Sequence, residues 1–202
     1  MARHRANAFV FLLIILAVAG LTTAAAVRSS PAAAARATTN GNTVGPRYDK
    51  DGALLLPDDY RRWIFIGSSL GMSYSEGSQG MEMFHETLME PTAYQHFVDT
   101  GTFREGTMLA LILHGSGERV PPMRQGRFAT EVHGVEMAVK DSSHRPEKWA
   151  YYNFGGMMGL RTAAQAMPKA SCHDCHAQHA KRDNVFLQFY TMLAEAAKVP
   201  LK

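Results

Sequence analysis

Strand-like alternation of apolar and polar residues dominates the middle of the chain. Residues 106–115, GTMLALILHG, are apolar at both alternating sets of positions, which predicts a strand buried on both sides. Residues 127–141, RFATEVHGVEMAVKD, also alternate, and their phase slips by one at His133–Gly134, as a β-bulge would cause. Shorter strands are predicted for FHETLME at 84–90 and for KWAYYNFGG at 148–156.

Helical spacing is confined to fewer segments. Residues 91–101, PTAYQHFVDTG, begin with a proline and end at a glycine, both typical of helix ends. Residues 177–198 place apolar side chains at helical spacing and predict one long amphipathic helix. Shorter helical pieces are expected at the start of 58–71 and within 160–167. A strand-rich body followed by a C-terminal helix predicts an α+β fold built on an antiparallel sheet.

The N-terminus has the composition of an export signal. A basic start, MARHR, precedes the apolar run from Phe9 to Leu21 and a cluster of small residues, which together predict a signal peptide over residues 1–26. Extended through the alanine cluster, the run would reach the roughly 20 residues of a spanning helix, so an uncleaved membrane anchor is the alternative. In either case we expect the body of the protein in the periplasm.

The rest of the chain divides into a lead-in and one domain. Residues 27–56 are rich in Ala, Thr, Gly and Pro without apolar periodicity, so a flexible linker is expected there, followed by a folded domain over 57–202. A hydrophobic content of 46% is enough for a core. The formal net charge is only +3, and no Lys/Arg cluster with interleaved aromatic residues is present, which argues against a nucleic-acid partner.

Both cysteines of the chain lie in one motif, SCHDCHA, in which Cys172 and Cys175 are followed directly by His176. A disulfide would close a very small loop, a structural zinc site needs four ligands, and a thioredoxin-like redox pair belongs to a βαβ setting. Covalent haem explains every part of the motif, because two thiols on one helical turn can bond the two vinyl groups while the histidine ligates the iron. One haem c is therefore favoured, with the other three chemistries as alternatives.

The position of the motif bears on the sixth coordination site of the iron. Downstream of His176 the sole methionine is Met192, which on a continuous helix would lie about 24 Å away at 1.5 Å per residue. A sixth ligand would have to come from upstream, where the candidates are Met72, Met81, Met83, His85 and His114. We therefore expect a five-coordinate iron with an open distal face that binds a small molecule such as NO, CO or hydroxylamine.

The order of these segments resembles the cytochrome P-460 family, which includes the β-sheet cytochromes c′ (cytochrome c′-beta). The resemblance rests on FHETLMEPTAYQHFVDTGTFREGTMLALIL at 84–113, KWAYYNFG at 148–155 and SCHDCH at 171–176, and it extends over about 59–197. Cytochrome c′ also has a C-terminal haem motif, but it is a four-helix bundle, and its upstream helices are not visible here. The resemblance implies a P-460-like fold with a haem-bearing C-terminal helix, in which Cys172 and Cys175 hold the haem.

By the same resemblance His176 is the proximal iron ligand, and the distal side divides the family. P-460 enzymes oxidise hydroxylamine and carry a lysine cross-linked to the haem, whereas β-sheet cytochromes c′ have an apolar pocket capped by Phe and bind NO and CO. Leu111 stands where the lysine is expected, and no lysine lies between Pro57 and Val139, which favours the branch without a cross-link. The distal-pocket candidates are Leu111, Phe84 and Phe103. Further candidates for the distal side or for haem propionates are Trp63, Phe65, Arg104, Tyr151, Tyr152 and Arg161.

Three functions follow from these patterns. The favoured one is an exported monohaem c-type cytochrome that binds NO- or CO-like ligands, with electron transfer as a further activity. The alternative is a P-460 enzyme that oxidises hydroxylamine or NO, and a further alternative is a non-haem protein that uses the cysteine pair for redox or metal chemistry. The expected partner is a small gaseous or nitrogenous ligand, with a redox-partner cytochrome and a homodimer as further options.

Overall fold

The computed structural model describes residues 45–73, 82–118, 120–122, 124–156 and 159–201. The expected signal peptide, and the expected linker before residue 45, lie outside these residues. Within them no helix is both long enough and apolar enough to cross a membrane.

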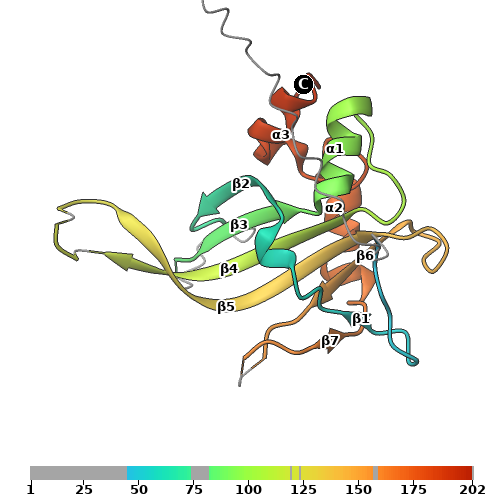
Figure 1. Cartoon of the computed structure of the whole chain (residues 1–202), viewed down its shortest axis with the longest axis horizontal. Coiled ribbons are helices and arrows are strands. Elements are labelled where there is room, and N and C mark those ends of the chain that lie inside the picture. Colours follow the sequence, from blue (N-terminus) through green and yellow to red (C-terminus); the bar gives the residue numbers. More distant parts are fainter. Residues whose placement is uncertain (1–44, 74–81, 119, 123, 157–158, 202) are drawn as a thin grey trace, which may run out of the picture. The chain divides into compact units, whose positions relative to one another are not determined.

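A five-stranded antiparallel sheet forms the body of the fold, in the order β2-β3-β4-β5-β6 (Figure 1). Its strands are β2 (Ile64–Leu70), β3 (Phe84–Met89), β4 (Met108–Glu118), β5 (Arg127–Lys140) and β6 (Trp149–Asn153). A second, two-stranded antiparallel sheet pairs β1 (Leu54–Leu55) with β7 (Ala163–Ala164). With the helices described below, this arrangement confirms the expected α+β class.

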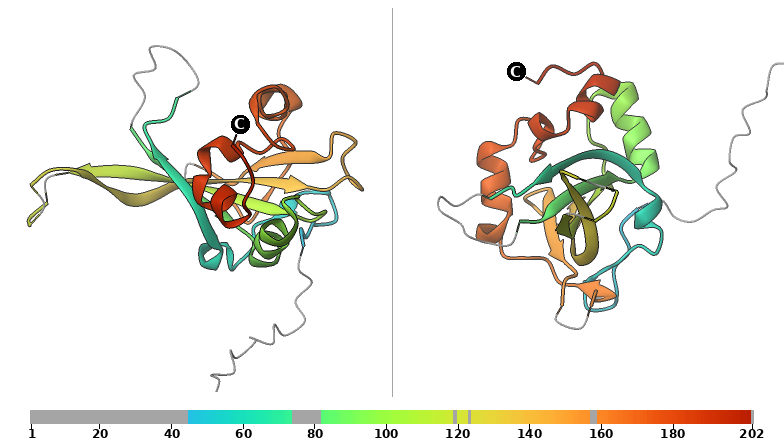
Figure 2. Two further views of the ribbon diagram at one scale, coloured as in Figure 1. Left: turned by 90° about the horizontal axis from the view of Figure 1, so that it is seen from above. Right: turned by 90° about the vertical axis from the view of Figure 1, so that its left-hand side faces the viewer.

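The sheet has a core on each side, as the doubly apolar pattern of β4 predicts. Because side chains alternate along a strand, Ala110 and Ile112 point to one face and Leu109 to the other. The first face packs against β1, β7 and a 3₁₀ turn at Tyr60–Arg62. The second face packs against α1 (Pro91–Thr100) and the C-terminal segment. Figures 1 and 2 show α1 and α3 (Thr191–Ala196) on one side of the sheet, and β1 and β7 on the other.

The predicted bulge in β5 is confirmed. Leu113 pairs with Gly134 and His114 pairs with Val132, so His133 is the extra residue that faces no partner on β4. The predicted helix α1 is confirmed as well. The Glu90 carboxylate accepts hydrogen bonds from the backbone N–H groups of Thr92 and Ala93 at its start.

The prediction of one long C-terminal helix over 177–198 is wrong. The chain instead forms α2 (His173–His179), a 3₁₀ turn at Leu187–Phe189, and α3. Between them Asp183 and Asn184 adopt left-handed backbone conformations, with φ of 45° and 60°, which a right-handed helix cannot contain. The distance argument that set Met192 apart from the haem site therefore has no basis, although its side chain is 56% exposed.

One other helical expectation was wrong in the same way. Residues 163–164 form β7 rather than a helical turn, because Ala163 and Ala164 pair with Leu55 and Leu54. The short helical piece expected at the start of 58–71 is present as the 3₁₀ turn at Tyr60–Arg62, after which the segment continues as β2, whose alternation exposes Ile64 and buries Ile66.

The folded unit begins earlier than the expected boundary at Pro57. Leu54 is completely buried in the core beside the sheet, and the Tyr48 hydroxyl donates a hydrogen bond to Asp141 Oδ2 at 2.9 Å. Residues 45–56 thus pack on the domain and are not a linker. Their composition gave no such sign because one buried leucine and one pairing strand do not make a periodic pattern.

Replacement of Leu54 tests this boundary. We expect Leu54→Ala to lower the free energy of unfolding by about 2–5 kcal/mol, because it leaves a cavity in a closed core. Leu70→Ala, at a leucine that is 40% exposed, should change it by less than about 0.5 kcal/mol. Urea unfolding followed by circular dichroism measures both, and equal small effects would show that the N-terminal segment does not belong to the folded unit.

Candidate haem-binding site

The cysteine motif lies at the start of α2. Cys172 is the N-cap residue, and its carbonyl accepts the hydrogen bond from the His176 N–H at 3.1 Å, so the motif forms one helical turn. Both cysteines are free, partly buried thiols. Cys172 Sγ lies 3.8 Å from the Met167 Sδ. Because residues three apart share one face of a helix, Cys172 and Cys175 present their thiols to the same side.

The imidazole of His176 is fixed by a backbone carbonyl. His176 Nδ1 lies 2.8 Å from the Asn184 carbonyl oxygen, and since a carbonyl only accepts, Nδ1 carries the proton. The lone pair of Nε2 is then free to ligate a metal. The rings of Tyr151 and Phe186 each lie 4.4 Å from the imidazole, and burial lowers the pKa of His176, which favours the neutral ring that ligation requires.

Two adjoining cavities, each of about 80 Å³, lie between α2 and the second face of the sheet. Both are lined by Thr87, Leu111, His176, Phe186 and Tyr190. The first cavity, which we call the thiol cavity, also contains Cys172, Glu136 and Met167. The second, which we call the His85 cavity, also contains His85, Ser69 and Met72. Cross-strand pairing places Thr87, Leu111 and Glu136 in one row of the wall.

Glu136 is a site residue that the sequence did not reveal. Burial raises the pKa of its carboxyl group, and the Asn153 side-chain amide donates a hydrogen bond to Oε1 at 3.1 Å. In the sequence Glu136 occupies an ordinary polar position of an alternating strand. Only its pairing with Leu111 shows that this position faces the cavity and not solvent.

The residues present fit a c-type haem. Two thiols on one face of a helical turn, a neutral imidazole with a free Nε2 and a largely apolar wall are the groups that such a cofactor needs. The sheet beside the motif is antiparallel throughout, unlike the βαβ setting of thioredoxin-like pairs. In the described part of the chain, no three His, Cys, Asp or Glu side chains are grouped to hold a metal ion by themselves.

Of the three named distal-pocket candidates, only Leu111 lines the cavities. Phe84 pairs with His114 and so projects from the other face of the sheet, because it is one residue out of phase with His85 and Thr87. Phe103 stacks on Phe97, with ring centroids 4.3 Å apart, in the core beneath α1. The assignments of Phe84 and Phe103 to the distal pocket are therefore wrong, since strand register and loop packing direct both rings elsewhere.

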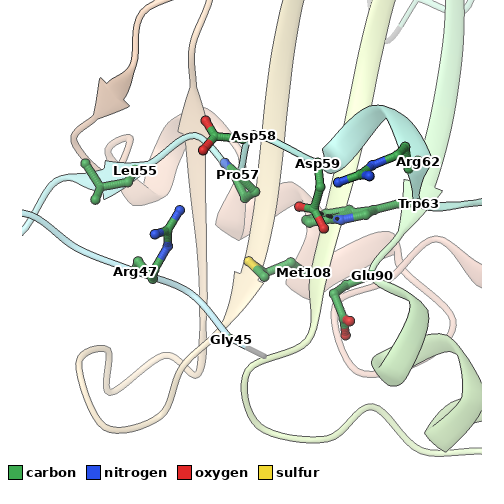
Figure 3. Close-up of a pocket in the computed structure, with 10 residues that line it drawn as sticks. All are labelled: Gly45, Arg47, Leu55, Pro57, Asp58, Asp59, Arg62, Trp63, Glu90 and Met108. Carbon is green, nitrogen blue, oxygen red and sulfur yellow. Dashed lines mark hydrogen bonds between the residues drawn. The ribbon is translucent and has the colours of Figure 1, made fainter. Parts of the chain in front are cut away.

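Trp63 and Arg104 also lie elsewhere. Trp63 lines a separate pocket of about 220 Å³, where its Nε1 donates to Asp59 Oδ1 at 3.3 Å (Figure 3). Arg104 forms an ion pair with Glu90, 3.3 Å apart. Phe65 is 42% exposed on the edge strand β2.

The three residues considered as partners of the haem propionates lie in different positions. The Tyr151 hydroxyl donates to the same Asn184 carbonyl that holds His176, at 3.3 Å. Tyr152 is fully buried in the core on the opposite face, and Arg161 donates to the Asn153 carbonyl at 2.5 Å. Tyr151 is therefore part of the wall around His176, Tyr152 also lines the thiol cavity although it is buried in the opposite core, and Arg161 lines neither cavity.

The candidates for the sixth iron ligand also lie in different parts of the fold. His85 and Met72 line the His85 cavity, whereas His114 is on the other face, with its Nδ1 2.9 Å from the Thr130 carbonyl oxygen. Met83 lines neither cavity, and Met81 lies outside the described residues.

The chain matches the model of a known protein family. The model of the cytochrome P460 family matches residues 57–187, well over half of the chain and the part that contains β2 to β6, α1 and the cysteine motif. No curated protein matches the chain in sequence.

The half-buried carboxyl of Glu136 predicts a pH-dependent stability. Its pKa in the folded state is raised above the unfolded value of about 4.3, so folding favours the protonated form, and stability is lost as the pH rises from that value through the raised pKa. We expect Glu136→Gln to remove this loss, so that the variant gains stability relative to the natural protein between pH 4 and pH 8. Urea unfolding across this range measures the slope, with the exposed Glu195→Gln as control. Equal slopes in all three proteins would contradict the prediction.

Proposed function

The chain belongs to the cytochrome P460 family, and from this premise we propose that it is an exported monohaem cytochrome whose iron binds NO- or CO-like ligands on one open side. Membership of the family makes the protein a haem-binding, c-type cytochrome. Covalent attachment, the open coordination site and export are the proposed parts. The observation that carries the first two is the pairing of the cysteine motif with a cavity that adjoins His176, and export is supported by the signal-like composition of residues 1–26.

The attachment is supported by the chemistry of α2. Cys172 and Cys175 are free thiols on one helical turn, and both can form thioethers. His176 offers Nε2 as the proximal ligand, since its Nδ1–H donates a hydrogen bond to the Asn184 carbonyl. When bound, the haem supplies an iron that exchanges one electron and accepts a small axial ligand.

The open side is supported by the composition of the wall. Leu111 stands at its centre and contributes to both cavities, and a leucine offers the iron neither a ligand nor a cross-link. Thr87 is 4% exposed, and its hydroxyl already contacts the Tyr190 hydroxyl at 3.5 Å. Met192 lines neither cavity. The wall therefore excludes water around a small ligand without offering a strong ligand from its centre.

Glu136 favours a second candidate function, the oxidation of hydroxylamine at the same site. That reaction removes protons as well as electrons from the substrate, so it needs a base beside the substrate and an external electron acceptor. Glu136 lies in the thiol cavity, and its raised pKa brings the carboxyl group nearer to the pH at which a base is most effective. A redox-partner cytochrome would take the electrons.

Replacement of the cysteines tests attachment and export together. We expect the protein from a periplasmic expression host to carry one haem that survives denaturation, and its mass to show loss of residues 1–26. Cys172→Ala with Cys175→Ala should abolish the covalent haem, while Ser171→Ala should retain it. Intact mass spectrometry measures both features. A haem that stays bound to the double variant through denaturation would disprove the attachment.

Optical spectra and turnover separate the two candidate functions. For a ligand-binding cytochrome, we expect a high-spin c-haem spectrum that shifts with CO and NO, and no steady consumption of hydroxylamine when an electron acceptor is supplied. For an enzyme, we expect sustained turnover that falls roughly 100-fold or more in Glu136→Ala, as for loss of a general base. Glu195→Ala is the control. Turnover that is unchanged in Glu136→Ala would exclude this residue as the base.

A further inference from the structure

His85 is the residue of the site whose role the proposed function leaves open. It lies on β3, paired with Ser69 of β2 and Leu113 of β4, two residues from Thr87 on the same face of the sheet. It lines the His85 cavity together with His176. The strand pattern therefore directs an imidazole to the cavity that also contains the proposed iron ligand.

The imidazole of His85 is half-buried, and among the described residues it has no hydrogen-bond partner. His114, by contrast, lies 2.9 Å from the Thr130 carbonyl oxygen, and His144 lies 2.8 Å from the Asp141 carboxylate. Burial lowers the pKa of His85, which favours the neutral ring with one N–H donor and one acceptor nitrogen. A half-buried donor without a partner among the described residues is available to a ligand.

The cavity suits a small ligand. Its volume of about 80 Å³ corresponds to roughly two or three water molecules at about 30 Å³ each. Leu111, Phe186 and Phe189 supply apolar walls. The Tyr190 hydroxyl, another polar group of the lining, accepts the hydrogen bond of Thr87 and keeps its own proton. His85 adds an imidazole donor to this cavity, beside the hydroxyls of Ser69 and Tyr190.

We propose that His85 donates a hydrogen bond to the small ligand of the haem pocket, so that the pocket favours anionic or strongly accepting ligands over CO. The proposal rests on the proposed function, because it requires haem in the pocket with an open side. It assigns His85 a role in selecting the ligand and not in holding the iron. Hydrogen-bond donors around a haem are among the features that decide which ligands bind.

Two probes of opposite character test the role. Fluoride binds ferric haem as an anion that accepts hydrogen bonds strongly, whereas CO binds ferrous haem and accepts them weakly. We expect His85→Leu to weaken fluoride binding about tenfold, as for loss of one hydrogen bond to a charged group, and to leave CO affinity within about twofold. His85→Gln, which keeps an N–H donor, should recover most of the fluoride affinity.

A matched variant completes the experiment. His96→Leu, on α1 and outside both cavities, should bind fluoride as the natural protein does. Titrations at one fixed pH, followed by absorbance of the purified holoproteins, give the dissociation constants. Haem content, measured for each variant, shows that the site remains loaded.

The outcomes separate this proposal from the function on which it rests. Fluoride affinity unchanged in His85→Leu, with haem and CO binding intact, overturns the role of His85 and leaves the function standing. A ligand-free spectrum of six-coordinate low-spin haem that becomes high-spin in His85→Leu also overturns it, in favour of direct coordination. Failure of the natural holoprotein to bind CO, NO or fluoride overturns the function and the proposal together.

Discussion

The hydrogen bond between His176 Nδ1 and the Asn184 carbonyl holds the rest of the site in place. It fixes the proton on Nδ1, leaves Nε2 free and orients the ring between Tyr151 and Phe186. The carbonyl reaches the imidazole only because α2 ends at His179 and the chain turns back through left-handed residues at 183–184. In a continuous helix that carbonyl would accept an intrahelical hydrogen bond instead.

The two faces of the sheet differ in what they pack against. One face packs against β1, β7 and the N-terminal segment and is a closed apolar core. The other combines a core beneath α1 with the cavities beside α2. Because side chains alternate along a strand, adjacent residues such as Val135 and Glu136 belong to different environments. The closed core keeps the strands in register, and the register aligns Thr87, Leu111 and Glu136 as one wall of the site.

The wall is mostly apolar, and its desolvated titratable groups include Glu136 and His85. Burial raises the pKa of Glu136 and lowers that of His85, so in each case it favours the uncharged form. They belong to different cavities that share His176, one beside the thiols and the other beside Ser69 and Met72. A small ligand would therefore meet a neutral imidazole on one side and a carboxyl group able to exchange a proton on the other.

The sequence by itself determined the long strands, the bulge at His133 and the helix at 91–100, because each depends on residues close together in the chain. It misassigned the C-terminal segment, where Val185, Phe189 and Met192 fall at helical spacing although a turn separates them. Only the tertiary structure decided that Leu111, Glu136 and His85 face the cavities while Phe84 does not. That choice depends on cross-strand register and on which element covers each face, and both arise from contacts between residues far apart in the sequence.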